Sequence, residues 1–435
     1  MSTWLEKQFH LKEYQTSART EIIAGLTTFI AMAYVLATVP NMLGNAGLDK
    51  GAVLTLMILL IIGTSLAMAF VTNRPFALAP GLGSVSIVAG MMANDGVSPE
   101  HAAGVIFWSG IIFCVISFLG MREAVVKVIP KSLKAAVTAG VGLFIALLGA
   151  KQCGLVVANE AKSALGFGDL TSPTVILALI GFVLIMIAKV RKIPGGMILA
   201  ILITTLIGIP MGITTVPESI VSLPLSPAPQ LFRIDFLGSL KFAYIPFLIA
   251  LFIPDFFSTF GTVLGVGGMA GYLDENGDLP GIDKCFRVDA VATVAGGLFG
   301  IPSMTTYFES SAGVEAGGRT GLTVVGTCIG FVLALFLAPL ALMIPSAATA
   351  PALISIGVGM LNSMRQVNYS DYTEAFPAFL CIAFTLFGNN IANGICVAIP
   401  VYLLLKLISG KGKEINAVLI IVTAVCGLYF YTLVR

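Results

Sequence analysis

The sequence predicts an all-α protein that crosses a membrane many times, and three observations predict this fold class. The chain has 435 residues, of which 57% are hydrophobic and only 11% are Asp, Glu, Lys or Arg, whereas about a quarter of the residues in a soluble domain are charged. Its mean hydropathy is +0.99. Apolar runs of about 20 residues, enough to cross a bilayer as a helix, recur along the whole chain. A soluble fold is therefore excluded.

Fifteen apolar segments are candidate spans, and no cleavable signal peptide is expected before them because residues 1–21 are polar and aromatic. The candidates are 22–43, 52–72, 77–92, 102–120, 133–150, 173–189, 194–213, 242–268, 285–300, 303–318, 321–343, 348–364, 373–388, 391–408 and 415–433. Seven precede and seven follow the Pro-rich segment 214–241, and 415–433 is an additional C-terminal helix. Segments 77–92 and 303–318 are short and interrupted by Gly, Pro or polar residues, so we expect an extended stretch followed by a half-helix in each.

The distribution of basic residues predicts the orientation of these spans. With residues 1–21 as a cytoplasmic tail and alternating sides, 18 of the 24 Lys and Arg residues lie on the cytoplasmic side and 6 on the outer side. Cytoplasmic loops carry such an excess of positive charge. We therefore expect a multi-pass protein of the inner (plasma) membrane with a cytoplasmic N-terminus.

Two pairs of segments indicate an internal repeat. KAAVTAGVGLFIALLG at 134–149 is similar to PALISIGVGMLNSM at 351–364, and the segment 192–207 is similar to 390–405. Each repeat contains seven spans, so the two halves must have opposite orientations in the membrane. Inverted repeats with interrupted segments are typical of secondary transporters, whose binding site lies near the bilayer midplane.

Most carboxylates fall in loops or near span ends, but two lie well inside predicted spans, Asp255 in the eighth and Glu309 in the tenth. A charge at the bilayer centre costs about 2.5–3.5 kcal/mol even on insertion scales. Either these groups bind a polar substrate and exchange protons, or they are protonated carboxyls whose hydrogen bonds are satisfied by neighbouring backbone. Glu309 follows the extended stretch SMTTYF, which contains Thr306 and Phe308 and whose free backbone groups could bind an amide-like ligand.

The sequence offers little for other chemistries. The seven cysteines include no CxxC pair, and the two histidines, His10 and His101, lie far apart. We therefore expect no metal, no cofactor and no enzyme activity. The net charge of +2 is too small to indicate a nucleic-acid partner.

Several motifs together resemble a known family. They are TTFIAMAYVLATVPNML in the first span, RPFALAPGLG in the third, PDFFSTFGTVLGV in the eighth and TTYFESSAGVEAGGRTGLT in the tenth. The chain resembles the nucleobase–cation symporter superfamily with the nucleobase–ascorbate transporter fold, in its guanine–hypoxanthine permease branch. The resemblance implies a fold of seven plus seven inverted spans, and import of a purine such as guanine, hypoxanthine, xanthine or adenine by proton symport with alternating access.

The resemblance also implies roles for individual residues. Glu309 matches the glutamate that binds nucleobase N–H groups, and Asp255 matches an acidic residue that binds substrate and is tied to proton coupling. The chain departs from the branch at Val85, where an Asn is usual, and at Ser258, where a second Asp is usual. The substrate-binding residues implied by the resemblance and by their neighbourhood are Glu309, Asp255, Ser84, Val85, Ser86, Ser258, Thr306 and Phe308, with Asp255 and Glu309 as the proton-coupling groups.

The same resemblance divides the chain into a substrate-holding core and a gate. The expected units are a core in 22–120 and 242–343, a gate in 121–213 and 344–408, an extracytoplasmic linker in 214–241 and a C-terminal helix in 409–435. The sequence leaves alternatives open: uracil or an organic or inorganic anion as substrate, sodium instead of protons as coupling ion, an ion channel or membrane sensor instead of a transporter, and a homodimer. The lipid bilayer is an expected partner in every case.

Overall fold

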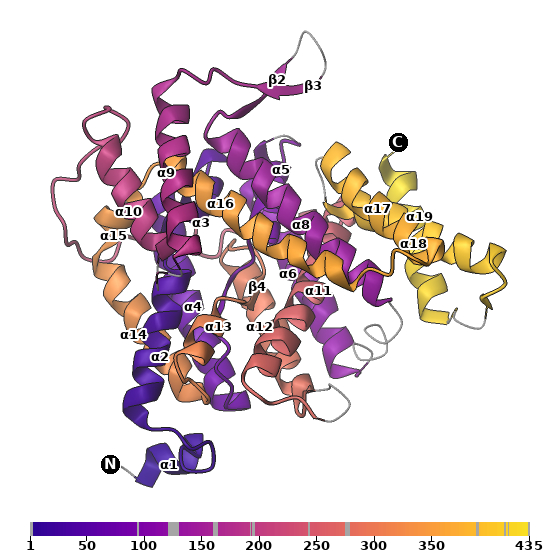
Figure 1. Cartoon of the computed structure of the whole chain (residues 1–435), viewed down its shortest axis with the longest axis horizontal. Helices are drawn as coiled ribbons and strands as arrows, with labels where there is room; N and C mark the ends of the chain where they lie inside the picture. Colours follow the sequence, from indigo (N-terminus) through magenta and orange to yellow (C-terminus); the bar gives the residue numbers. More distant parts are fainter. Residues whose placement is uncertain are drawn as a thin grey trace.

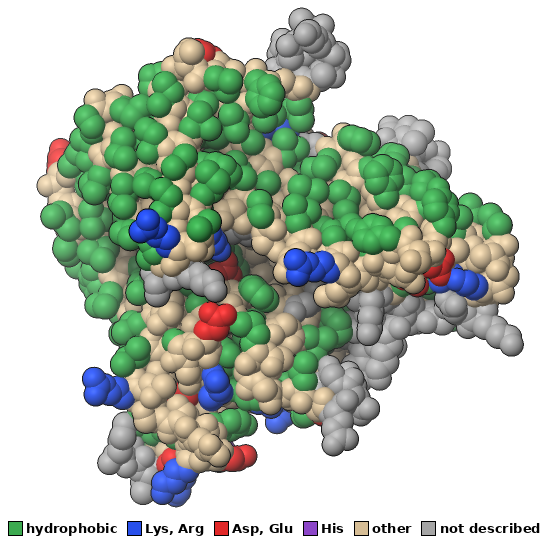
Figure 2. Space-filling view, in the orientation of Figure 1, with side chains coloured by type: hydrophobic (Ala, Val, Ile, Leu, Met, Phe, Trp, Pro, Cys, Tyr) green, Lys and Arg blue, Asp and Glu red, His purple; other side chains and the backbone are tan. Residues whose placement is uncertain are grey.

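The computed structural model describes residues 3–93, 95–120, 130–159, 164–191, 193, 196–241, 244–274, 279–388, 391–412, 415 and 417–433. Within these residues, six helices are long and apolar enough to cross a membrane, and five shorter helices are also apolar. Figure 2 shows hydrophobic side chains over most of the upper part of the molecule, whereas most charged side chains in this view lie in the lower part, on the side of the N-terminus.

Each of the fifteen predicted segments contains a helix. The elements of the first half are α1 Thr3–Phe9, α2 Ala18–Met32, α3 Val35–Asn45, α4 Lys50–Thr72, β1 Leu78–Pro80, α5 Leu82–Ala93, α6 Pro99–Phe118, α8 Lys131–Gln152, β2 Val156–Asn159, β3 Ala164–Phe167, α9 Pro173–Val190 and α10 Gly196–Gly208. Those of the second half are η2 Gly238–Leu240, α11 Ile245–Met269, α12 Ile282–Leu298, β4 Met304–Thr306, α13 Ser310–Glu315, α14 Gly321–Phe336, α15 Ala338–Leu342, α16 Ser346–Met360, η4 Leu361–Gln366, α17 Tyr372–Phe387, α18 Ile391–Ile408 and α19 Ala417–Leu433.

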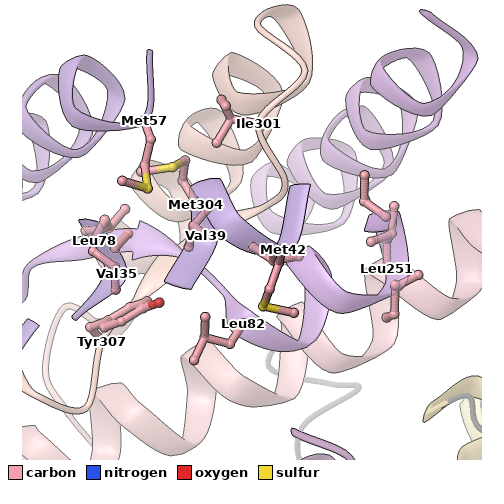
Figure 3. Close-up of a cluster of buried hydrophobic side chains, with 14 of the residues drawn as sticks. Val35, Val39, Met42, Met57, Leu78, Leu82, Leu251, Ile301, Met304 and Tyr307 are labelled. Carbon is pink, nitrogen blue, oxygen red and sulfur yellow. The ribbon is translucent and has the colours of Figure 1, made fainter. Parts of the chain in front are cut away.

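The two interrupted segments fold as expected, each with an extended stretch before a short helix. Strand β1 precedes α5, and strand β4 precedes α13. The two strands pair antiparallel, with Leu78 opposite Thr306 and Pro80 opposite Met304. Figure 3 shows Leu78 and Tyr307 beside Val35 and Val39 of α3 in the buried core. Segments from opposite halves of the chain therefore meet at the centre of the molecule.

The helices pack into two sets, and each set draws on both halves of the chain. In the first set α2 packs against α14, α6 against α12, and α4 against α14 and α12. In the second set α8 packs against α16 and α17, α9 against α10 and α16, and α18 against α17 and α19. The first set, as the term is used below, comprises α2–α6 and α11–α15, and the second set comprises α8–α10 and α16–α19 (Figure 1).

The repeated GVG motifs meet in space within the second set. Gly142 of α8 and Gly357 of α16 lie so close that a methyl group built on Gly357 would be 2.4 Å from the carbonyl oxygen of Gly142. A methyl group on Gly142 would be 2.9 Å from the Gly357 carbonyl. Small residues allow helix backbones to approach in this way in membranes. The motif that indicates the repeat therefore also forms the contact between its two copies.

A charge pair with a buried lysine and a partly buried glutamate connects helices of the second set. The Lys406 side chain in α18 is 1% exposed, and its Nζ lies 3.7 Å from Oε1 of Glu374 in α17. Ser132 of α8 donates a hydrogen bond to the same carboxylate. Because a buried charge is stable only when it is paired and hydrogen-bonded, this cluster favours one arrangement of the three helices.

One feature differs from the sequence-based expectation, and some predicted positions lie outside the described residues. The predicted all-α fold does not include the hairpin of β2 and β3, with Val156 opposite Phe167; the short run VVAN lacks the alternation that marks a strand. The predicted boundary between residues 120 and 121 and part of the repeat segments, at residues 192 and 390, fall on residues outside those that the structure describes.

Candidate substrate site

Strands β1 and β4 form the floor of the candidate site, and their backbone groups are satisfied by hydrogen bonds. Tyr307 N–H donates to the Ala77 carbonyl and Gly81 N–H to the Ser303 carbonyl, each at 2.9 Å. The Leu78 N–H donates to the Ser65 hydroxyl at 2.9 Å. Extended backbone at membrane depth is tolerated only where it is buried in protein or lines a cavity. The strand pair therefore lies away from the lipid, either inside the protein or at the wall of a cavity.

Glu309 lies three residues after the end of β4, at the residue before α13 begins. Its Oε1 accepts a hydrogen bond of 2.7 Å from the Tyr34 hydroxyl. Tyr34 is 2% exposed and lies between α2 and α3. Here a turn interrupts the helix of the predicted first span: Leu36 N–H donates a hydrogen bond to the Ala33 carbonyl, and Ala37 N–H donates to the Tyr34 carbonyl. This turn brings the phenol to the carboxylate, so one oxygen of Glu309 is held in place.

The face beside Glu309 is open. The Phe308 side chain is 56% exposed, Ser258 of α11 is also exposed, and Glu309 is only partly buried. The Phe308 ring packs over Gly265, where an added methyl group would lie 3.3 Å from ring carbon Cε2. Ser258 lies two helical turns before Gly265 on the same face of α11. Phe308, next to Glu309 in the chain, therefore lies against α11, and Ser258 lies on the same face of that helix about 10 Å from Gly265 along its axis. The face drawn in Figure 2 is hollowed near its centre, where the two helix sets meet.

Asp255 lies behind the strands and not on this open face. It is 2% exposed, and its Oδ2 accepts a hydrogen bond of 3.1 Å from Thr293 of α12. The Thr293 hydroxyl also lies 3.4 Å from the carbonyl oxygen of Met304 in β4. Asp255 is therefore connected to the floor of the site through one threonine, and direct contact with a substrate stays a prediction.

A second buried carboxylate, Asp289 of α12, has an equivalent connection to β4. It is fully buried, and its Oδ2 accepts a hydrogen bond of 2.8 Å from the Thr259 hydroxyl. Thr259 in turn shares a hydrogen bond of 2.7 Å with Thr305 of β4. Two acid–threonine pairs thus support the same strand from behind, one from Asp255 and one from Asp289.

The remaining predicted residues lie within or near the strand–helix turns. Ser84, Val85 and Ser86 are all buried in the first turns of α5, and the Ser86 hydroxyl donates to the Gly83 carbonyl at 2.6 Å. The Thr306 hydroxyl is buried and has no hydrogen-bond partner among the described residues. Val85, at the position of the usual Asn, is completely buried and adds no polar group to the site.

Sequence reasoning missed two polar side chains of this site, Tyr34 and Asp289. Tyr34 is the one tyrosine of the first predicted span, and this phenol inside a spanning segment is a signal that could have been used. Asp289 follows the charged run DKCFR near the start of the predicted ninth span, and the sequence alone predicts no role for it. The structure shows that α12 begins at Ile282, which places Asp289 two turns inside the helix.

Comparison with known proteins identifies the family. The family model Xan_ur_permease, described as a permease family, matches residues 19–397. The chain is 37% identical over 419 residues to the adenine permease AdeP of Escherichia coli, covering 96% of this chain and 94% of that protein. It is 36% identical over 421 residues to the guanine/hypoxanthine permease PbuO of Bacillus subtilis, and the match covers 95% of this chain and 97% of that protein.

Among solved structures, the transmembrane domain of the cyanobacterial bicarbonate transporter BicA is similar, with a TM-score of 0.64 and 16% identity over 86% of this chain and 97% of that one. At this identity the likeness concerns the fold alone, and it confirms the predicted fold class, a helical membrane protein of the 7+7 type. Since the family model matches most of the chain and full-length permeases share more than a third of its residues, the chain belongs to the permease family of nucleobase–ascorbate transporters and is a multi-pass membrane transporter, not an enzyme.

Proposed function

We propose that this protein imports a purine nucleobase by proton symport with alternating access. The observation that carries the proposal is Glu309, a carboxylate fixed by Tyr34 at the end of two paired strands, beside an exposed aromatic ring. The names of the permeases AdeP and PbuO, which carry adenine and guanine/hypoxanthine, support a purine as the substrate.

The geometry suits a flat molecule with adjacent N–H groups. A carboxylate has two oxygens and can accept two parallel hydrogen bonds, and such charge-assisted bonds are about twice as strong as neutral ones. Tyr34 binds one oxygen of Glu309, and this contact sets the direction in which the carboxylate can accept from a base. The exposed ring of Phe308 offers a stacking surface, and base–aromatic stacking contributes about 1–3 kcal/mol per base.

The two helix sets are proposed to act as core and gate. The first set carries both strands, Glu309 and both buried aspartates, and therefore holds the substrate. The second set packs around the contact of α8 with α16. Alternating access would follow from sliding of the first set against the second. Each set contains segments of both repeats, as expected for transporters in which one bundle moves against another.

Proton coupling is assigned to Asp255 and Glu309, as the sequence predicts. A carboxylate at membrane depth is costly when charged, so it favours either a proton or a hydrogen-bonding ligand. Asp255 contacts β4 through Thr293, and protonation there can alter the position of the strand that precedes Glu309. The alternative of an anionic substrate is disfavoured, because a carboxylate would repel an anion at the binding position.

The substrate class can be tested by thermal-shift and equilibrium-binding measurements on the purified protein with purines, pyrimidines and small anions. We expect stabilisation by one or more purines at micromolar concentration, because binding to the folded state alone raises the melting temperature. Stabilisation only by uracil, or only by bicarbonate or another anion, would reject the purine assignment.

The orientation in the membrane can be tested by labelling single cysteines. Asp95, in the loop after α5, is expected outside, and Arg191, at the end of α9, inside. A membrane-impermeant thiol reagent added to intact cells should label Asp95→Cys and should label Arg191→Cys only after permeabilisation. Cys114, the one native cysteine that is not buried, should first be replaced by Ser. The opposite labelling pattern would reject a cytoplasmic N-terminus.

Loss of the tyrosine hydroxyl should weaken purine binding without unfolding the protein. In Tyr34→Phe the Glu309 carboxylate loses a hydrogen bond of the kind that contributes about 1.5–3 kcal/mol, and we expect roughly 10- to 100-fold weaker binding. Tyr369→Phe is the matched control, because the Tyr369 side chain is 65% exposed and lies in the loop between η4 and α17, outside the candidate site. Equal effects of both substitutions on affinity would show that Tyr34 has no specific part in binding.

A further inference from the structure

A second hollow runs along helix α5 from Ser86 to Ala93. It has a volume of about 230 Å³, and neither Glu309 nor Phe308 is among the described residues that line it. Its walls are formed by the ends of α3 and α5, the loop residue Asp95, and the helices α8 and α11. By the predicted orientation, Asp95 places this cavity on the outer side of the membrane.

The cavity has the mixed lining of a small-molecule site, apolar with a few polar groups. Two aromatic rings line it, Phe144 from α8 and Phe247 from α11. Its polar side chains are Asn45, Ser86, Asp95 and Gln152. The Ser86 hydroxyl uses its proton on the Gly83 carbonyl, so its oxygen remains an acceptor.

The chemistry of this lining selects against anions. Among the described residues that line the cavity, none is Lys or Arg, and Asp95 carries the only formal charge. Carboxylate, amide and hydroxyl oxygens accept hydrogen bonds from N–H groups, and aromatic faces bind flat rings. The fitting ligand is therefore a flat, uncharged or weakly cationic heterocycle with several N–H donors.

The position of the cavity connects it to the proposed substrate site. Helix α5 begins at Leu82 beside strand β1 and ends at Ala93 in the cavity wall, a length of about 18 Å. The first set supplies α3, α5 and α11 to the wall, and the second set supplies α8. The cavity therefore lies between the two sets, and sliding of one set against the other would change its shape.

We propose that this cavity is an outer docking site that binds the transported base weakly before the base reaches Glu309. The inference rests on the proposed function for the class of ligand. It assigns a second, weaker base-binding site to the boundary between the two helix sets, with Phe144, Phe247 and Gln152 as its main contacts.

The test is equilibrium dialysis of the full-length purified protein with radiolabelled adenine, and with guanine as a second probe, from nanomolar to millimolar concentration. Wild-type protein should bind one equivalent tightly and a second one at least about 100-fold more weakly, a difference of about 2.8 kcal/mol. Glu309→Gln should lose the tight component and keep the weak one.

In the Glu309→Gln background, Gln152→Leu removes a hydrogen-bonding group at nearly constant size and should weaken the remaining component about tenfold, as expected for one hydrogen bond. Phe144→Ala should weaken it further. Gln366→Leu is the matched control, since Gln366 is exposed in η4 and does not line the cavity, and it should have no effect. Melting temperatures report whether each variant is folded.

Two results would overturn the proposal: tight binding by the wild type with no saturable binding in Glu309→Gln, or residual binding that is unaffected by both Gln152→Leu and Phe144→Ala. Absence of any purine binding in the wild type is a different result, because it rejects the proposed function and the docking site together.

Discussion

Glu309→Gln should reduce the affinity for purines by about a thousandfold while the protein remains folded. The substitution replaces one acceptor oxygen by an NH₂ donor and removes the charge from both hydrogen bonds to the base. A bond to a charged group contributes about 1.5–3 kcal/mol, so the loss of two such contacts amounts to roughly 4 kcal/mol. Each 1.4 kcal/mol corresponds to a tenfold change in affinity. The new donor would also face an N–H group of the base.

Glu315→Gln is the matched control for this prediction. Glu315 ends the same short helix, α13, but its side chain is exposed, so the same chemical change should leave purine affinity within about twofold, because surface substitutions have small effects. Equilibrium binding and melting temperature should be measured for both variants. Affinity within a few-fold of wild type in Glu309→Gln would reject the assignment of Glu309 as the base-binding carboxylate.

Asp255→Asn should separate binding from accumulation. The amide keeps the size of the side chain and can still accept the hydrogen bond from Thr293, which lies 3.1 Å from Oδ2 in the wild type. Strand β4 should therefore stay in place, and purine affinity should fall by less than about tenfold, the equivalent of one hydrogen bond. An amide cannot exchange a proton in the physiological range, so uptake driven by a pH gradient should be lost.

The measurement for this variant is uptake into proteoliposomes with and without an inward proton gradient, together with binding. Asp289→Asn should be tested in parallel, because Asp289 contacts β4 through Thr259 and Thr305 in a matching way. Continued accumulation by Asp255→Asn in response to the gradient would move the coupling role to Asp289 or Glu309. Uptake that follows a sodium gradient and ignores pH would reject proton coupling altogether.

The spans and the site strands were predictable for a physical reason. Apolar runs of spanning length are required by the bilayer, and the interrupted segments at 77–92 and 303–318 could not be continuous spanning helices. Both became a strand followed by a half-helix. Glu309 could be found because a carboxylate inside an apolar segment is costly. These features depend on local sequence, so local sequence was sufficient.

What the sequence could not predict depends on contacts between distant segments. The pairing of β1 with β4 and the hydrogen bond from Tyr34 to Glu309 join residues more than 200 positions apart, and no local pattern specifies such partners. The same holds for Asp289, whose position inside α12 depends on where the helix begins. Asp255 was expected at the substrate because of its depth, but its position behind β4 is decided by how α11 packs against α12.

The most direct test of the account is uptake of radiolabelled adenine and guanine by proteoliposomes that contain the wild-type protein and carry an imposed inward proton gradient. The account predicts accumulation of at least one of these purines above its external concentration, abolished by a protonophore and by Glu309→Gln but not by Glu315→Gln. Uptake that only reaches the external concentration regardless of the gradient, or that is unchanged in Glu309→Gln, would contradict it.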